Sequence, residues 1–440
     1  MFSAAMMRHT QEETGASSVL HRVLWITVAG FAIAIPLYVS PHAEDTFRLP
    51  KELLLRAEAV AVASSIVIAA IWQKLKLRSL FFDRVTGMVL AVCAVAAASS
   101  TALSANRAIS VRSMIYVAAC ILTFWAVYIA AYRKNLDKVV LIGAAAGMLN
   151  APLAIAQRLE WFSPFQFEGS LPLQMRITAL VGNSNDVGAS LAVCLIPVAV
   201  LAVMRRRLLV IVAASVLLGG VIAANALTAL LAVAVGLAFL VLLASRRIGW
   251  RILIALIVVG LATVIIPLPL RARLHAMATA ARARDYDALT SHRIVPFLAA
   301  IEIFRDHPLV GAGPGTFKWL YLPYRLRVEA AHPSLYLKTI ENVGEVHSDQ
   351  LQVLAEEGLM GYAAFLVAMI ALGSRTLAIK KENGEQNERA QFVRLASPPL
   401  AVCFFLLAAT GFPLELSAVM MPFLFFAGTL FRWSADANVS

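Results

Sequence analysis

Charged residues are scarce in this chain. Asp, Glu, Lys and Arg make up 15% of its 440 residues, whereas 60% are hydrophobic, and the mean hydropathy is +0.78. Because about a quarter of the residues in a soluble domain are charged, this composition indicates that lipid is the main solvent of the chain. Strict alternation of apolar and polar residues is also missing, which argues against a membrane β-barrel.

Cysteine is rare as well. All four cysteines lie inside apolar runs, and their spacing matches neither a zinc site nor a disulfide framework. We therefore interpret Cys93, Cys120, Cys194 and Cys403 as small hydrophobic core residues.

Long apolar runs dominate what is present. A hydrocarbon core of about 30 Å needs roughly 20 apolar residues for each helical span. We predict an all-α polytopic membrane protein of about twelve transmembrane helices. Nine fall in residues 1–270 and three in 351–440, with a large helical periplasmic loop, 271–350, between spans 9 and 10. The predicted spans are 22–40, 53–73, 85–104, 111–132, 138–156, 187–204, 208–224, 226–244, 252–270, 351–372, 397–411 and 414–431.

The basic residues predict the orientation. The net charge of +12 could suggest nucleic acid, but Lys and Arg cluster in alternate short loops between apolar runs, as the positive-inside rule requires. We expect no nucleic-acid partner. Both termini and these basic loops should face the cytoplasm. Outside should lie 41–52, 157–186 and 271–350. The seventh and eighth spans, almost without a linker, should form a tight hairpin.

The loop 271–350 is rich in Arg and His. A solvated amphipathic helix on anionic headgroups remains an open alternative for 271–290. Arg and His at a membrane mouth are otherwise costly unless they pair or meet a ligand. The side chains in question are Arg271, Arg273, Arg282, Arg284, Arg293, Arg305, Arg325, Arg327, His275, His292, His307, His332 and His347.

Within this loop, two residues stand out for chemistry. Arg293 opens a predicted helix over 293–304, and His347 lies at the mouth of the tenth span. Arg offers a planar fork that suits phosphate oxygens, and His can take a proton from an attacking hydroxyl. A single loop His is more often a surface residue, but together the two suit a lipid-linked diphosphate and a sugar hydroxyl. The glycines at 311, 313 and 315 follow no strand, which argues against a Rossmann site.

The stretch 291–361 resembles the signature region of the O-antigen ligase and polymerase superfamily. Weaker resemblances lie in RITALVGNSNDVGASLAVCLIP at 176–197 and FRLPKELLL at 47–55. This chain departs from the family at the start of the eighth span. The family usually has Ser-Arg there, and its Arg is often assigned to binding the diphosphate. This chain has Asn225-Ala226-Leu227-Thr228 instead. The signature residues are Arg293, His307 to Phe317, His347, Ser348, Asp349, Leu351, Gln352, Glu356, Gly358 and Gly361.

The resemblance implies a membrane-embedded glycosyltransferase of the C type, located in the bacterial inner membrane with its active site facing the periplasm. Its glycan donor is linked to undecaprenyl diphosphate. The acceptor is a lipid A-core hydroxyl for a ligase, which we favour, a growing glycan for a polymerase, or a protein Ser or Thr for an O-oligosaccharyltransferase. Ligases of this kind need no metal or other cofactor, and the outer loops indeed lack a compact carboxylate cluster. A transporter, the other class considered, should show repeated halves and ionisable residues near the midplane.

The resemblance also assigns roles to individual residues. We expect His347 to activate the acceptor and Arg293 to hold the diphosphate, with inversion at the anomeric carbon. Arg176 is a second clamp, and Arg48 or Lys51 are weaker candidates. We further place Gly313, Gly315, Asp349 and Glu356 in the substrate-binding region, although for Glu356 an orienting or helix-packing role is the stronger interpretation.

Overall fold

The structure, a computed structural model, describes residues 2–73, 83–132, 134–165, 176–244, 269–335, 343–376 and 385–439. All regular secondary structure in these ranges is helical, which confirms the predicted all-α class. The helices of the bundle are α1 (Phe2–Leu37), α2 (Arg48–Gln73), α3 (Arg84–Ala102), α4 (Arg107–Ala130), α5 (Leu136–Arg158), α7 (Ser184–Arg205), α8 (Leu208–Ala224), α9 (Leu227–Leu243), α15 (Asp349–Ser374), α16 (Glu385–Thr410) and α17 (Ser417–Val439).

Nine of the described helices are long and apolar enough to cross a membrane, and α8 and α9 are shorter apolar helices of 17 residues. Eleven of the predicted spans therefore coincide with helices, as expected for a multipass membrane protein. The ninth, 252–270, lies almost entirely outside the described residues.

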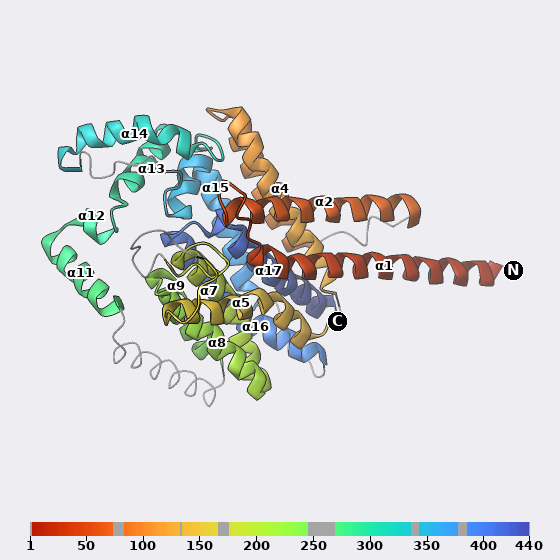
Figure 1. Cartoon of the computed structure of the whole chain (residues 1–440). Coiled ribbons are helices and arrows are strands. Elements are labelled where there is room, and N and C mark those ends of the chain that lie inside the picture. The colour runs from red at the N-terminus through yellow and green to blue at the C-terminus, as the bar shows by residue number, and fades with distance from the viewer. Residues whose placement is uncertain are drawn as a thin grey trace.

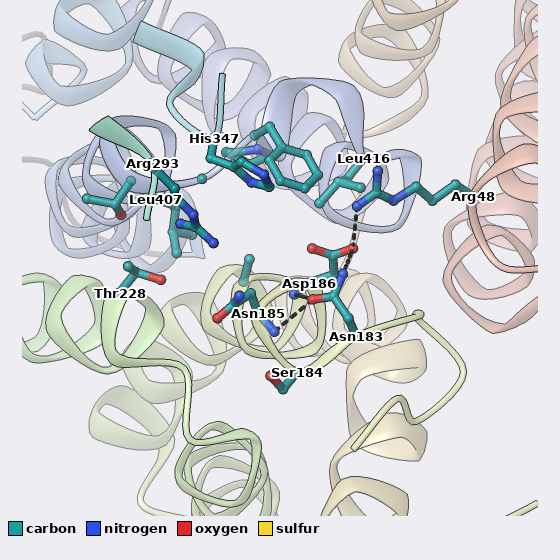
Figure 2. A pocket seen from close by; sticks show the side chains of 15 residues that line it. Arg48, Asn183, Ser184, Asn185, Asp186, Thr228, Arg293, His347, Leu407 and Leu416 are labelled. Carbon is teal, nitrogen blue, oxygen red and sulfur yellow. Dashed lines mark hydrogen bonds and ion pairs between the residues drawn. The ribbon is translucent and has the colours of Figure 1, made fainter. Parts of the chain in front are cut away.

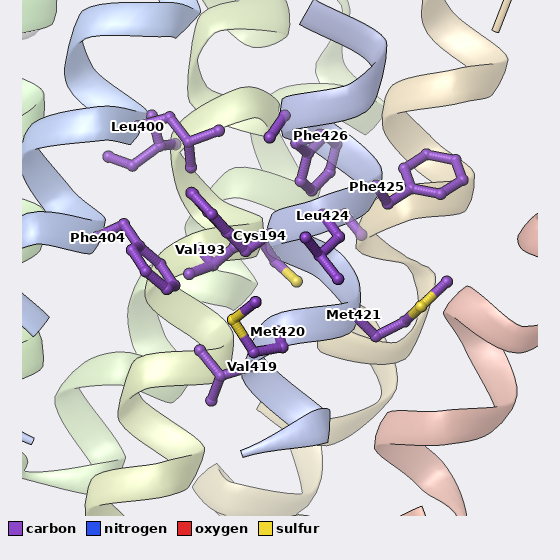
Figure 3. Close-up of a cluster of buried hydrophobic side chains, with 14 of the residues drawn as sticks. Val193, Cys194, Leu400, Phe404, Val419, Met420, Met421, Leu424, Phe425 and Phe426 are labelled. Carbon is purple, nitrogen blue, oxygen red and sulfur yellow. The ribbon is translucent and has the colours of Figure 1, made fainter. Parts of the chain in front are cut away.

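Small residues bring the bundle helices together. A Cβ atom on Gly220 of α8 would lie 2.6 Å from the Cβ of Ala151 in α5, and one on Gly147 of α5 would lie 2.9 Å from the Sγ of Cys194 in α7. Such close approach is how helices pack in lipid, where the hydrophobic effect offers little between them. Larger side chains fill the centre: Figure 3 shows Cys194 of α7 near Phe404 of α16 and Met420 of α17. The cysteines are free, and two of them are fully buried, as predicted.

The connection between α8 and α9 differs from the prediction. Asn225 adopts a left-handed conformation, with φ of 53°, and turns the chain after α8. The two helices then contact each other only slightly, because α9 packs along α16 and α7 instead. Gly236 allows this approach, since a Cβ there would lie 2.9 Å from Ile196 of α7. The expected tight hairpin of α8 and α9 is therefore wrong.

Much of the loop 271–350 is helical, as predicted. Its helices are α11 (Pro269–Ala283), α12 (Tyr286–Leu289), α13 (Ile294–Asp306) and α14 (Phe317–Ala331), and residues 336–342 lie outside the described ranges. Figure 1 shows them gathered at one end of the bundle, opposite the N-terminal end of α1. The helices α2, α4, α7, α9, α15 and α17 begin at this end, which we call the cavity end.

The α13–α14 pair has its own apolar cluster, which packs against α15. The most buried apolar residues of α13 are aliphatic: Val295, Ala299, Ala300 and Ile303 are at most 1% exposed, whereas Phe297 is only half-buried. Small side chains face α14 and α15 because they let the helices approach closely. This packing fixes the start of α13, and with it Arg293.

Candidate functional site

A cavity of about 510 Å³ lies at the cavity end of the bundle (Figure 2). The beginnings of α2, α7 and α9 contribute to its lining, as do the start of α13, the segment before α15 and the turn between α16 and α17. Its lining residues are Arg48, Asn183, Ser184, Asn185, Asp186, Ala189, Thr228, Arg293, His347, Leu407, Thr410, Gly411, Phe412, Pro413 and Leu416. Three residues predicted to act on substrate, Arg48, Arg293 and His347, thus share one cavity.

His347 lies two positions before α15, in a left-handed conformation with φ of 62°. Its ring packs edge-on against Phe412, with 5.2 Å between the ring centroids. Burial, together with the positive charges of Arg293 and Arg48, lowers the pKa of His347 from 6.5 to about 4. Its Nδ1 atom is buried and has no hydrogen-bond partner within the described ranges. At neutral pH the ring is therefore neutral and able to accept a proton.

Arg293 immediately precedes α13 and is half-buried at the cavity wall. Figure 2 shows its guanidinium reaching into the space below His347. The two side chains are close enough for the charge of Arg293 to act on the pKa of His347. A guanidinium and a neutral imidazole that line one cavity can bind an anion and accept a proton from the same bound ligands.

Arg48, the first residue of α2, is held by two carboxylates. Its guanidinium lies 3.0 Å from Oε1 of Glu345 and 3.5 Å from Oδ2 of Asp186. It also lies over the ring of Phe412, at 4.7 Å from the centroid. Arg48 therefore joins α2 and α7 to the segment before α15, next to His347, and its charge is already balanced by protein groups.

Lys51 and Arg176 do not line this cavity, although we predicted both as substrate-binding. The ammonium of Lys51 donates hydrogen bonds of 2.8 Å to the carbonyls of Tyr38 and Phe47, and so ties the preceding segment to α2. Arg176 lies 4.0 Å from Glu160, and its side chain is 43% exposed. Their placement gives Lys51 a role in holding the α1–α2 connection and leaves Arg176 at the surface.

Gly313 and Gly315 also lie away from the cavity lining. A Cβ on Gly313 would lie 2.0 Å from the hydroxyl of Ser104, at the turn between α3 and α4. The carboxylate of Glu356 accepts hydrogen bonds of 2.8 Å from the backbone N–H groups of Gly315 and Phe317. The glycine segment thus packs tightly between α3, α4 and α15, and Glu356 orients it.

The two halves of the signature meet through their backbones. Gly358, with φ of 64° and ψ of −160°, interrupts α15. Around this interruption, segment 308–313 pairs with α15: the N–H of Gly313 donates to the carbonyl of Glu356, and that of Leu359 donates to the carbonyl of Pro308. Gly311 must be glycine, since a Cβ there would lie 2.2 Å from the backbone of Glu356.

Asp349 has a comparable structural role. Its backbone N–H donates to the carbonyl of Gly411 at 2.8 Å, and its carboxylate accepts from the N–H of Leu414 at 2.7 Å. These bonds fix the turn between α16 and α17, which carries Phe412. Gln352, one turn further along α15, accepts from the N–H of Val346 at 3.0 Å. The start of α15 therefore positions His347 on one side and Phe412 on the other.

Several cavity residues were not predicted. Asn183 caps α7 and donates to the carboxylate of Asp186 at 2.7 Å. Both lie in the quoted segment 176–197, where an Asn before a helix and an Asp in its first turn signal a cap. Thr228, in the second position of α9, lies within the four residues that replace the family's Ser-Arg. Phe412 had no sequence signal that linked it to His347.

Residues for a metal ion are not gathered here. Across the described residues, no three His, Cys, Asp or Glu side chains come together in a way that could hold one. The arrangement instead offers guanidinium, imidazole, amide and hydroxyl groups.

Residues 212–366 match a family model described as "O-Antigen ligase". This segment contains Thr228, Arg293 and His347. The match supports the O-antigen ligase and polymerase superfamily, to which the motifs had pointed, and members of this family are membrane enzymes of the glycosyltransferase kind. No curated protein matches the chain.

Proposed function

We propose that this protein is an O-antigen ligase, which transfers a glycan from undecaprenyl diphosphate to a hydroxyl of the lipid A core at the periplasmic face of the inner membrane. The observation that carries the proposal is that Arg293 and a neutral His347 line the same cavity at the ends of the helices. The reaction needs no metal and inverts the anomeric carbon.

Arg293 binds the diphosphate in this proposal. A guanidinium can form two parallel hydrogen bonds to phosphate oxygens, and it stabilises the charge that develops as the diphosphate departs. Arg48 contributes less, since Glu345 and Asp186 already balance its charge. Arg48 instead holds the segment that carries His347.

His347 takes the proton of the acceptor hydroxyl as that oxygen attacks the anomeric carbon. Burial and two guanidinium groups keep its pKa low. A bound diphosphate offsets these positive charges, so the basicity of the imidazole rises when the donor is present. Base strength is thereby coupled to donor binding.

Two related reactions use the same glycan donor and differ in the acceptor. A polymerase transfers the glycan to a growing glycan, and a protein O-oligosaccharyltransferase transfers it to Ser or Thr. A transporter, the alternative from another class, is disfavoured because the Arg and His side chains of the site lie at helix ends and not near the midplane.

A deletion strain tests the proposal. We expect its lipopolysaccharide to have an intact core without long glycan, and we expect the wild-type gene to restore the glycan. Long glycan on the core in the deletion strain would overturn the ligase assignment. A product with a single repeat unit would favour the polymerase.

A further inference from the structure

The wall opposite Arg293 and His347 carries uncharged polar side chains. Figure 2 shows Asn185 and Thr228 on this wall, across the cavity from the two catalytic candidates. Asn185 lies in the first turn of α7 and Thr228 in the first turn of α9, and both line the cavity.

This wall does not suit a phosphate. The side chain of Asn183 accepts the backbone N–H groups of Asn185 and Asp186, at 2.9 and 3.0 Å, so the end of α7 does not offer them to an anion. The carboxylate of Asp186 adds a negative charge beside them, balanced by Arg48. An anionic ligand therefore gains neither backbone N–H donors of α7 nor a net positive charge from this side of the cavity.

The polar groups of the wall are nevertheless available. Within the described part of the chain, neither the amide of Asn185 nor the hydroxyl of Thr228 has a protein hydrogen-bond partner. Both groups can donate and accept hydrogen bonds, as sugar hydroxyl and acetamido groups do. Half-buried groups of this kind favour a ligand that can pair with them.

Resting on the function proposed above, we propose that Asn185 and Thr228 form a subsite for the donor's first sugar, the one attached to the diphosphate. In an inverting displacement the attacking oxygen, the anomeric carbon and the departing diphosphate oxygen lie in line. His347 and Arg293 serve the two ends of this line. The sugar ring extends sideways from the anomeric carbon and meets the remaining wall, which Asn185 and Thr228 provide.

The subsite selects sugars by their neutral polar groups. A site built to hydrogen-bond a hydroxyl discriminates against a ligand that lacks it, because the protein groups are then left unpaired. A sugar acid is disfavoured as well, since Asp186 lies within the same wall. The expected ligand is therefore a neutral hexose or N-acetylhexosamine.

The test compares lipid probes with and without a sugar. The purified full-length protein would be titrated with farnesyl diphosphate and with farnesyl diphosphate joined to glucose, galactose, N-acetylglucosamine or N-acetylgalactosamine. We expect at least one sugar-linked probe to bind more tightly than farnesyl diphosphate. Thr228→Val and Asn185→Leu should each weaken binding of that probe about 3- to 10-fold, the value of one hydrogen bond, and leave farnesyl diphosphate unaffected.

A matched control and the outcomes separate this inference from the proposed function. Thr429→Val removes a hydroxyl that donates to the carbonyl of Phe425 within α17, away from the cavity, and should change neither affinity. If no sugar-linked probe gains affinity, or if Thr228→Val and Asn185→Leu leave the gain intact, the subsite is overturned while diphosphate binding stands. If the wild-type protein does not bind farnesyl diphosphate, the proposed function itself fails.

Discussion

Arg48 and Glu345, which are 297 positions apart in the sequence, form an ion pair with 3.0 Å between Nη1 and Oε1. Glu345 lies two residues before His347, so the first residue of α2 holds the segment that carries the imidazole. Because Arg48 also contacts Asp186 and the ring of Phe412, this one side chain links four parts of the cavity wall. In the proposed mechanism, the main contribution of Arg48 is to position His347.

Glu345→Gln should lower the rate of glycan transfer about 2- to 5-fold, in line with the modest strength of a partly exposed ion pair. Binding of farnesyl diphosphate should be unchanged or slightly tighter, since a negative charge is lost near the cavity. The measurement is a comparison of the transfer rate with the dissociation constant. Weaker diphosphate binding with an unchanged rate would contradict the positioning role of Arg48 and Glu345.

Arg293→Lys keeps the positive charge but loses the planar fork. Loss of one hydrogen bond to a charged group should weaken transfer and farnesyl diphosphate binding about 10- to 100-fold. Arg327→Lys is the control, because Arg327 is paired with Asp306 and does not line the cavity. Equal affinities in the wild type and the Arg293 variant would remove Arg293 from the diphosphate site.

His347→Ala should reduce transfer by about 10²–10⁴, the usual contribution of a general base. Farnesyl diphosphate should still bind, because the contact to Arg293 remains. His275→Ala, on the exposed face of α11, is the matched control and should transfer glycan normally. A His347 variant with a near wild-type rate would show that another group activates the acceptor.

The loss of activity at low pH should follow the protonation of His347. In the free protein its pKa is about 4, so the acid limb of kcat/KM should lie near that pH, with activity lost as the imidazole is protonated. The bound diphosphate raises this pKa, so the acid limb of kcat should lie at a higher pH than that of kcat/KM. Coincident limbs would argue against coupling between the donor and His347.

The same group affects stability. Its pKa is lower in the folded protein than the ordinary value of 6.5, so the unfolded chain binds more protons between these two values. The stabilising contribution is complete above about pH 6.5 and is lost as the pH falls toward 4. The free energy of unfolding should be measured against pH for the wild type and for His347→Ala across this range. It should change less with pH in the variant.

Glu356→Gln should destabilise the glycine segment. The carboxylate now accepts the N–H groups of Gly315 and Phe317, whereas one end of a Gln amide carries only donors. One buried N–H then lacks an acceptor, which costs about 1–3 kcal/mol. Thermal unfolding of the purified protein measures this loss. An unchanged melting temperature would contradict the orienting role of Glu356.

By itself, the sequence determined the helices and the two leading residues of the site. A helix that crosses the hydrocarbon core needs a long apolar run, which can be recognised from consecutive residues alone. Eleven predicted spans accordingly appear as helices. The start of α13 could also be predicted from the sequence, because a helical apolar pattern begins at Ile294 and a turn at His307 ends it. Arg293 and His347 could be selected because they belong to the motifs that resemble the O-antigen ligase and polymerase superfamily, and because Arg and His at a membrane mouth are costly without a partner or ligand.

Only the tertiary structure decided which polar residues reach the cavity. Lys51 and Gly313 looked like ligand groups in the sequence, but Lys51 donates to backbone carbonyls and Gly313 packs against the turn between α3 and α4. Thr228 lies where the family usually has Ser-Arg, so the sequence suggested only that a basic residue was missing. In the structure Thr228 lines the cavity, because α9 packs along α16 and α7 and not along α8. These outcomes depend on contacts between segments far apart in the chain, and no local pattern encodes which partner a side chain will meet.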